Sequence, residues 1–257
     1  MYKRDKIILF STVEPITAAI LFLVSIMTAA ISTSTGMGGG VIFFMLLLHY
    51  YPLGKTIPIH GFVQMFANIL RTYVLRAHLV WEMCLPFLVG AVLGVGSIMW
   101  VLDSFRSKVI PYTIILLLLI YSVFKPQKLP EIKIPLKAFG FVGYVTGFLG
   151  IIVGAVDPIL APFFVREDFS KEVLVANKSF MQSVIHLAKL PVFLQLGFQY
   201  TEHMLLLGIL LLGSAIGTYV GVWLLEKINR KIFMIVFKSI LFVLACRIAY
   251  QLYKLAI

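Results

Sequence analysis

Charged side chains are scarce in this chain. They make up 13% of its 257 residues, whereas hydrophobic residues make up 61%. An ordinary soluble domain carries about 25% charged residues, so this composition excludes a soluble globular protein and requires that the excess apolar surface faces lipid. Because one spanning helix takes about 20 residues, the chain has the length for roughly eight to ten membrane segments and no separate soluble catalytic domain.

Cysteine and catalytic motifs are equally sparse. Cys84 and Cys246 are the only cysteines, and both lie in apolar stretches. We expect two buried, unpaired thiols rather than a disulfide or a metal site. The sequence contains no HExxH, GxSxG or P-loop pattern, and no close pair of intramembrane carboxylates. We therefore expect no enzyme activity, no catalytic residue, no ATP hydrolysis within this chain, no metal and no cofactor.

Acidic residues are half as numerous as basic ones, 11 against 22, which gives a formal net charge of +11. In a soluble protein this balance would suggest a nucleic-acid partner. Here most lysines and arginines separate apolar runs, as residues that anchor membrane segments do. We therefore expect a lipid bilayer around the chain and no nucleic-acid partner.

The apolar segments follow the same order of lengths twice. Between the two series, residues 125–137 read KPQKLPEIKIPLK, which predicts an exposed linker. We predict a first transmembrane repeat at 1–124, this linker, and a second transmembrane repeat at 138–257. The expected segments are 7–31, 39–51, 57–75, 84–102 and 109–124, then 138–153, 158–165, 173–196, 204–225 and 232–253.

Alignment of the two halves indicates a duplication. Duplicated halves are typical of secondary transporters, whose site lies near the bilayer midplane, and five segments per half make the repeats antiparallel. The predicted fold class is an all-α polytopic membrane protein with two homologous inverted repeats of about four or five helical segments each, with short or broken helices after glycine-rich motifs. An offset of 118 residues pairs Gly36 with Gly154 and Gln64 with Gln182, and an offset of 123 pairs Gly90 with Gly213, Gly94 with Gly217 and Trp100 with Trp223.

Glycines interrupt the first apolar run at Gly36, Gly38, Gly39 and Gly40. Such a break suits a discontinuous helix whose next half begins with N–H groups that can receive a small anion. Close helix packing through small residues explains the same pattern without a ligand.

The counterpart of this break in the second half is Gly154, followed by Asp157 and Pro158. Asp157 is either the N-cap of the short segment that follows or a residue that exchanges a proton. In both cases a carboxylate inside the membrane needs a partner or a path to water.

Polar residues form one stripe in each half. The spacings of four, four and three residues place each stripe on one face of a helix, and we expect the two stripes to face each other and bind substrate. Asn177, next to the second stripe, adds further hydrogen-bond donors. The first stripe is His60, Gln64, Asn68 and Arg71, and the second is Lys178, Gln182, His186 and Lys189.

The stripe residues leave alternatives open. Gln64 and Gln182 either donate to substrate oxygens or bond between helices. Arg71 and Lys189 either neutralise an anion or extend to the lipid headgroups. His186 is either a proton carrier or a hydrogen-bonded histidine without that role.

Several of these features together resemble the TauE/SafE family of sulfite and organosulfonate exporters, also called the toluene-sulfonate uptake permease family. They are the GMGGG motif from Gly36 to Gly40, its echo at Gly154, the stretch from His186 to Lys189, and the duplicated layout. The resemblance implies transport of small sulfur-containing anions such as sulfite, sulfoacetate or sulfonates across the cytoplasmic membrane of bacteria and archaea.

We predict a secondary transporter that moves such an anion by alternating access, as an exporter, with proton coupling through Asp157 or His186. The sequence also allows a homodimer. The alternative is a membrane-embedded binding or assembly component without transport activity. A channel is disfavoured because it needs a continuous polar path.

Overall fold

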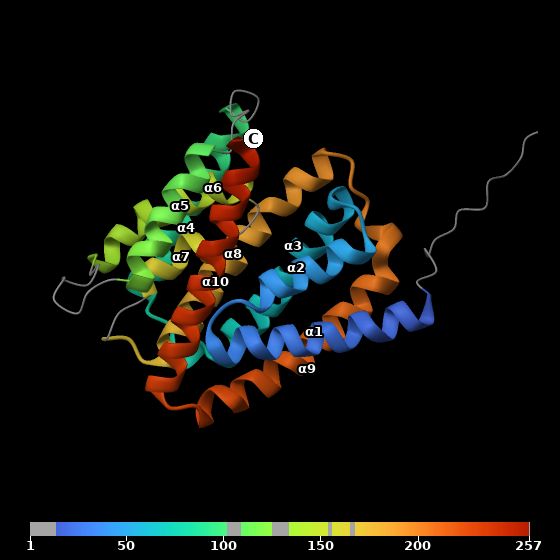
Figure 1. Cartoon of the computed structure of the whole chain (residues 1–257), viewed down its shortest axis with the longest axis horizontal. Coiled ribbons are helices and arrows are strands. Elements are labelled where there is room, and N and C mark those ends of the chain that lie inside the picture. Colours follow the sequence, from blue (N-terminus) through green and yellow to red (C-terminus); the bar gives the residue numbers. More distant parts are fainter. Residues whose placement is uncertain (1–13, 102–108, 125–133, 154–155, 165–167, 257) are drawn as a thin grey trace, which may run out of the picture.

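The computed structural model describes residues 14–101, 109–124, 134–153, 156–164 and 168–256. In these ranges the chain is helical and contains no strand (Figure 1). The helices are α1 (Pro15–Thr35), α2 (Gly39–Tyr50), α3 (Leu53–Val74), α4 (Trp81–Val101), α5 (Val109–Phe124), α6 (Phe139–Val153), α7 (Asp157–Leu160), α8 (Lys171–Gln195), α9 (Met204–Lys227) and α10 (Arg230–Ala256).

The outside of the bundle is apolar. Met27 is 63% exposed, and Leu212 and Val243 are each 65% exposed. Exposed apolar surface on this scale indicates contact with lipid rather than with water. Helices suit this environment because they satisfy their own backbone hydrogen bonds. Three stretches are long and apolar enough to cross a membrane, namely α1, Tyr200–Lys227 and Arg230–Lys254. The chain is therefore an all-α membrane protein.

The helices pack in a pattern that repeats. α1 packs along α9, and α6 packs along α4 (Figure 1). α3 packs against α8, and α5 packs against α10. If α1–α5 are matched in chain order with α6–α10, the α1–α9 pair becomes the α6–α4 pair and the reverse. The α3–α8 pair and the α5–α10 pair each map onto themselves. This is the behaviour of two halves related by a pseudo-two-fold axis.

The direction of the central pair shows that the halves are inverted. Near one end of this pair, Arg71 of α3 donates to the Ser179 hydroxyl of α8 over 3.3 Å. Further along, the rings of His60 and His186 lie 6.1 Å apart. Residue numbers therefore fall along α3 as they rise along α8. Because the two corresponding helices are antiparallel, the repeat is inverted, as the sequence predicts.

Glycines at equivalent positions of the two halves bring helices together. A Cβ atom on Gly94 of α4 would lie 2.1 Å from the carbonyl oxygen of Tyr144 in α6. A Cβ atom on Gly217 of α9 would lie 2.2 Å from the carbonyl oxygen of Ile26 in α1. Neither site has room for a side chain, so these paired glycines serve close helix packing.

The first glycine motif breaks a helix. α1 ends at Thr35 and α2 begins at Gly39, and between them Gly36 and Gly38 have φ angles of +79° and +89°. Glycine adopts these left-handed angles without the strain that a Cβ atom would add. In the second half, the short helix α7 continues into a 3-10 turn at Ala161–Phe164. Gly154 lies outside the described residues.

The two cysteines differ. Cys84 is buried, and its thiol contacts the Asn177 side-chain oxygen at 3.2 Å. Cys246 is exposed on α10. The expectation of two buried thiols is therefore wrong for Cys246, because an apolar segment at the edge of a membrane bundle turns part of its surface to lipid.

Candidate functional site

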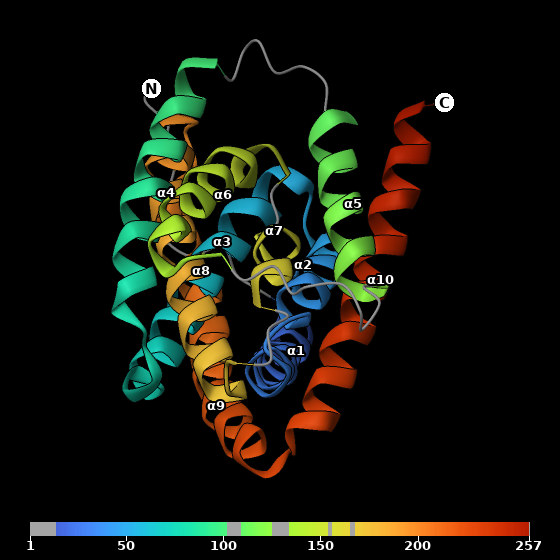
Figure 2. The ribbon, with the colours of Figure 1, turned by 90° about the vertical axis from the view of Figure 1, so that its left-hand side faces the viewer.

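The polar stripes lie on α3 and α8, which cross at the centre of the bundle beside α2 and α7 (Figure 2). Burial of these stripes sets the two helices apart from the apolar outer helices. Within the described residues, the buried side chains of the Arg, Lys, Asp and Glu types are three basic groups and one carboxyl group: Arg71, Lys178, Lys189 and Asp157. A charge at membrane depth costs about 2.5–3.5 kcal/mol on insertion scales, so unpaired cations here indicate an anionic partner.

Arg71 is 1% exposed and does not extend to the headgroups. Its Nε donates to the Thr33 hydroxyl over 2.8 Å, and its Nη1 donates to the Asn68 side-chain oxygen over 3.0 Å. Nη2 is buried and finds no hydrogen-bond partner among the described residues. Asn68 in turn donates to the backbone oxygen of Gln64 over 2.8 Å. Neighbouring side chains therefore orient the guanidinium group and leave one nitrogen available.

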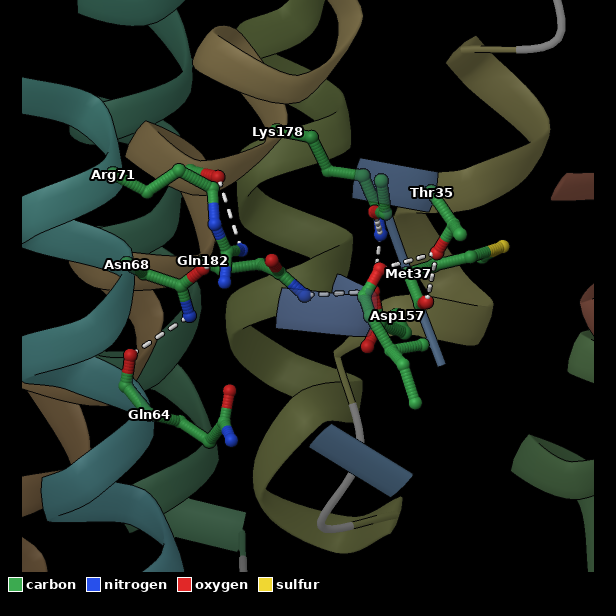
Figure 3. Close-up of polar contacts among 11 residues, drawn as sticks. Thr35, Met37, Gln64, Asn68, Arg71, Asp157, Lys178 and Gln182 are labelled. Atoms are coloured by element: carbon green, nitrogen blue, oxygen red, sulfur yellow. Dashed lines mark hydrogen bonds and ion pairs between the residues drawn. The ribbon is translucent and has the colours of Figure 1, made fainter. Parts of the chain in front are cut away.

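A small, partly open pocket lies beside Arg71. The Gln64 side-chain amide lines it. This amide has no hydrogen bond to a described residue (Figure 3). Three hydroxyl groups also line it, and each bonds a carbonyl of its own helix, a bond that rotation can exchange for one to a ligand. The lining is Ser25, Thr28, Ala29, Phe43, Val63, Gln64, Ala67, Arg71 and Ser214.

Sequence reasoning missed the hydroxyl groups of this pocket. Ser25 and Thr28 lie three residues apart on α1, a spacing that places them on one helix face and that a search for polar stripes would detect. Ser214 comes from α9, in the other half of the chain. Ser214 reaches this pocket because α9 packs along α1.

Asp157 forms the second polar cluster (Figure 3). Its Oδ1 pairs with the Lys178 ammonium group and accepts from Gln182 Nε2 over 2.8 Å. Lys178 also donates to the Gly36 carbonyl oxygen over 2.7 Å. The predicted need for a partner is met by Lys178. Lys178 thereby joins the helix break of the first half to the start of α7 in the second.

The N-cap interpretation of Asp157 is wrong. Asp157 is the first residue of α7, Val156 holds the N-cap position, and no side-chain cap bond forms there. The carboxylate instead pairs with Lys178 and accepts a hydrogen bond from Gln182.

Asn177 has a structural role. Its side-chain nitrogen donates to the carbonyl oxygens of His78 and Val173 over 2.9 and 2.7 Å. Its side-chain oxygen accepts from the Val80 N–H over 2.7 Å. Asn177 therefore ties α8 to the chain before α4, and its donors do not face the pocket.

The remaining stripe residues gather toward the other end of α3 and α8. His60 Nε2 lies 2.8 Å from the Gly40 carbonyl oxygen, which can only accept, so His60 carries its hydrogen on Nε2. Gly40 also lies beside Gln64, whose Oε1 would be 3.2 Å from a Cβ atom at Gly40. The start of α2 at Gly40 therefore borders the first stripe.

Two antiparallel halves, broken helices and buried cations at their interface are the architecture of a secondary transporter. A profile comparison agrees with this class: the family described as sulfite exporter TauE/SafE matches residues 21–248. The chain belongs to this family, which is a family of transporters. No curated protein and no solved structure matches it.

Proposed function

We propose that this chain is a secondary transporter that exports a small sulfur-containing anion of the sulfite, sulfonate or sulfoacetate type. The membrane we propose is the cytoplasmic membrane of a bacterium or archaeon, and the mechanism is alternating access between the two inverted halves. The observation that carries the proposal is Arg71, whose buried Nη2 has no hydrogen-bond partner among the described residues at a pocket lined by hydroxyl groups and a free amide. Family membership supports the transport of sulfur oxyanions.

The chemistry of the pocket suits an oxyanion. Arg71 offers a fixed donor with a positive charge, and hydrogen bonds of this kind are about twice as strong as neutral ones. Gln64 and the hydroxyl groups supply neutral donors for the other oxygens. Gly36, Gly38, Gly39 and Gly40 break the helix so that the start of α2 approaches Gln64. The backbone N–H groups at the start of α2 add to the positive field at the pocket.

One wall of the pocket is apolar. Phe43, Val63 and Ala67 lie there beside the donors. In this conformation the pocket has room for about one water molecule, so an anion enters it in a wider state of the alternating-access cycle. There this wall would contact the organic part of a sulfonate while the sulfur oxygens face Arg71. Sulfite itself needs only the polar side, so comparison of the two ligands measures what the apolar wall contributes.

Asp157 is the better placed of the two proton-coupling candidates. A proton on its carboxylate removes the charge that holds Lys178, and Lys178 is bonded to the Gly36 carbonyl at the other helix break. Protonation would therefore loosen the link between the two breaks and leave a cation available to the anion. His186 is the second candidate because its Nδ1 is buried without a hydrogen-bond partner in the described part of the chain.

The experiment measures thermal stability of the purified protein in detergent with sulfite, sulfoacetate, taurine, sulfate and acetate. A ligand that binds only the folded state adds about 2.7 kcal/mol at one hundred times its dissociation constant. Arg71→Lys should weaken sulfite binding by about 10- to 150-fold, because a hydrogen bond to a charged group contributes about 1.5–3 kcal/mol. Sulfite flux into proteoliposomes should fall in parallel.

Arg76→Lys is the matched control, since Arg76 is an exposed arginine near the end of α3 that lies over the Tyr73 ring. It should bind sulfite as the parent does. Absence of stabilisation by every sulfur anion, together with absence of flux, would overturn the proposal and favour an assembly component. Unchanged binding by Arg71→Lys would remove Arg71 from the site.

A further inference from the structure

The cation at the opposite end of the central helix pair has no role in the Arg71 pocket. Lys189 is 5% exposed and forms no ion pair or hydrogen bond with any residue in the described ranges. The only buried carboxylate in those ranges, Asp157, already pairs with Lys178 and Gln182. A cation at membrane depth without a counter-charge is costly, and an anion from outside the chain would compensate it.

The inverted repeat explains where this cation lies. The offset of 118 residues that pairs Gln64 with Gln182 also pairs Arg71 with Lys189. Because α3 and α8 are antiparallel, equivalent residues fall near opposite ends of the pair. Arg71 contacts Ser179, and Lys189 lies ten residues further along α8, which at 1.5 Å per residue is about 15 Å away.

The surroundings of Lys189 contain a second polar group without a partner. His186 is also 5% exposed, and its Nδ1 is buried without a partner among the described residues. It precedes Lys189 by three residues and therefore lies on the same face of α8. The His60 ring lies 6.1 Å from His186, with its Nε2 hydrogen committed to Gly40.

We propose that Lys189 and His186 form a second anion-binding site, distinct from the Arg71 pocket, and that the transported anion occupies the two sites in turn. This inference rests on the proposed function, because the ligand is the same small sulfur oxyanion. The Lys189 ammonium group supplies the charge, and His186 donates through Nδ1 when that nitrogen carries the hydrogen. The inverted repeat thus provides one cation for each side of the membrane.

The second site is expected to be the weaker one. At the offset of 118, Ser25 of the Arg71 pocket corresponds to Gly143, and at the offset of 123 Ser214 corresponds to Ala91. Both hydroxyl groups are therefore missing from the equivalent positions of the second site, and only Thr28 has a hydroxyl counterpart, Thr146. Lysine also offers a point charge where arginine offers a planar set of donors.

The test counts bound anions by equilibrium dialysis of the purified protein against radiolabelled sulfite under anaerobic conditions. The parent should bind two sulfite ions per chain with unequal affinities. Lys189→Met should bind one, with the affinity of the tighter site unchanged, and Arg71→Met should keep only the weaker one. Lys189→Arg keeps the positive charge and should still bind two sulfite ions. Lys227→Met, at an exposed lysine over the Trp223 ring, is the control and should bind two.

The outcomes separate the two proposals. One sulfite ion in the parent, retained by Lys189→Met, overturns the second site and leaves the Arg71 pocket standing. Loss of all binding in each single variant shows one site shared by both cations, which also overturns the second site. No sulfite binding in the parent overturns the second site, and it refutes the proposed function as well when no sulfur anion stabilises the protein and no flux is seen. If Lys189→Met does not fold, His186→Phe replaces it, with the same expected loss of one ion.

Discussion

The buried pair of Asp157 and Lys178 allows a quantitative prediction. Lys178 is 1% exposed and Asp157 is 8% exposed, and the carboxylate has Gln182 as its only other partner among the described residues. Removal of one member of a buried ion pair leaves an unpaired charge and costs about 3–5 kcal/mol. Asp157→Asn leaves the ammonium group with the Gly36 carbonyl, and Lys178→Met leaves the carboxylate with a single amide donor.

Each single substitution should therefore lower the unfolding midpoint by roughly 6–20 °C, since 1 kcal/mol corresponds to about 2–4 °C for a chain of this size. Asp157→Asn combined with Lys178→Met removes both charges and keeps the volume similar. Replacing both members of a buried pair is often close to neutral. The double variant should therefore lose much less than the sum of the two single losses.

The thiol of Cys84 can serve as the probe of thermal unfolding. Cys84 is buried and reacts with a thiol-specific dye only on unfolding, whereas Cys246 is exposed and must first be changed to serine. The melting curves of the parent, the two single variants and the double variant then form a double-mutant cycle. Single losses that add up in the double variant would refute the pairing of Asp157 with Lys178.

Two further stability predictions use the same assay. Gly217→Ala should destabilise the protein by about 1–3 kcal/mol, because its Cβ atom would meet the Ile26 carbonyl oxygen, whereas Gly208→Ala on the same helix meets nothing within 4 Å and should stabilise by about 0.5–1 kcal/mol. Equal effects at the two glycines would contradict close packing of α9 on α1. Asn177→Leu should lower stability by about 1–3 kcal/mol or more because it leaves the Val80 N–H and other buried groups unpaired, and a melting curve like that of the parent would contradict this role.

The contrast between Gln64 and Gln182 shows the limit of prediction from the sequence. The two residues are equivalent in the repeat, and nothing in their spacing distinguishes them. In the structure Gln64 lines a pocket with its amide free, while Gln182 is bonded to Asp157. The difference arises because the second half has a carboxylate at the start of α7 and the first half has glycine at the start of α2.

The sequence by itself determined the membrane class, the inverted repeat, the helix break at Gly36 and the two polar stripes, because composition and spacing are properties of the chain. The tertiary structure decided the partners: Lys178 with Asp157, Arg71 with Thr33, and Ser214 at the pocket of the other half. These contacts join segments far apart in the sequence. They depend on how far one helix slides and rotates against another, which the spacing along a single helix does not fix.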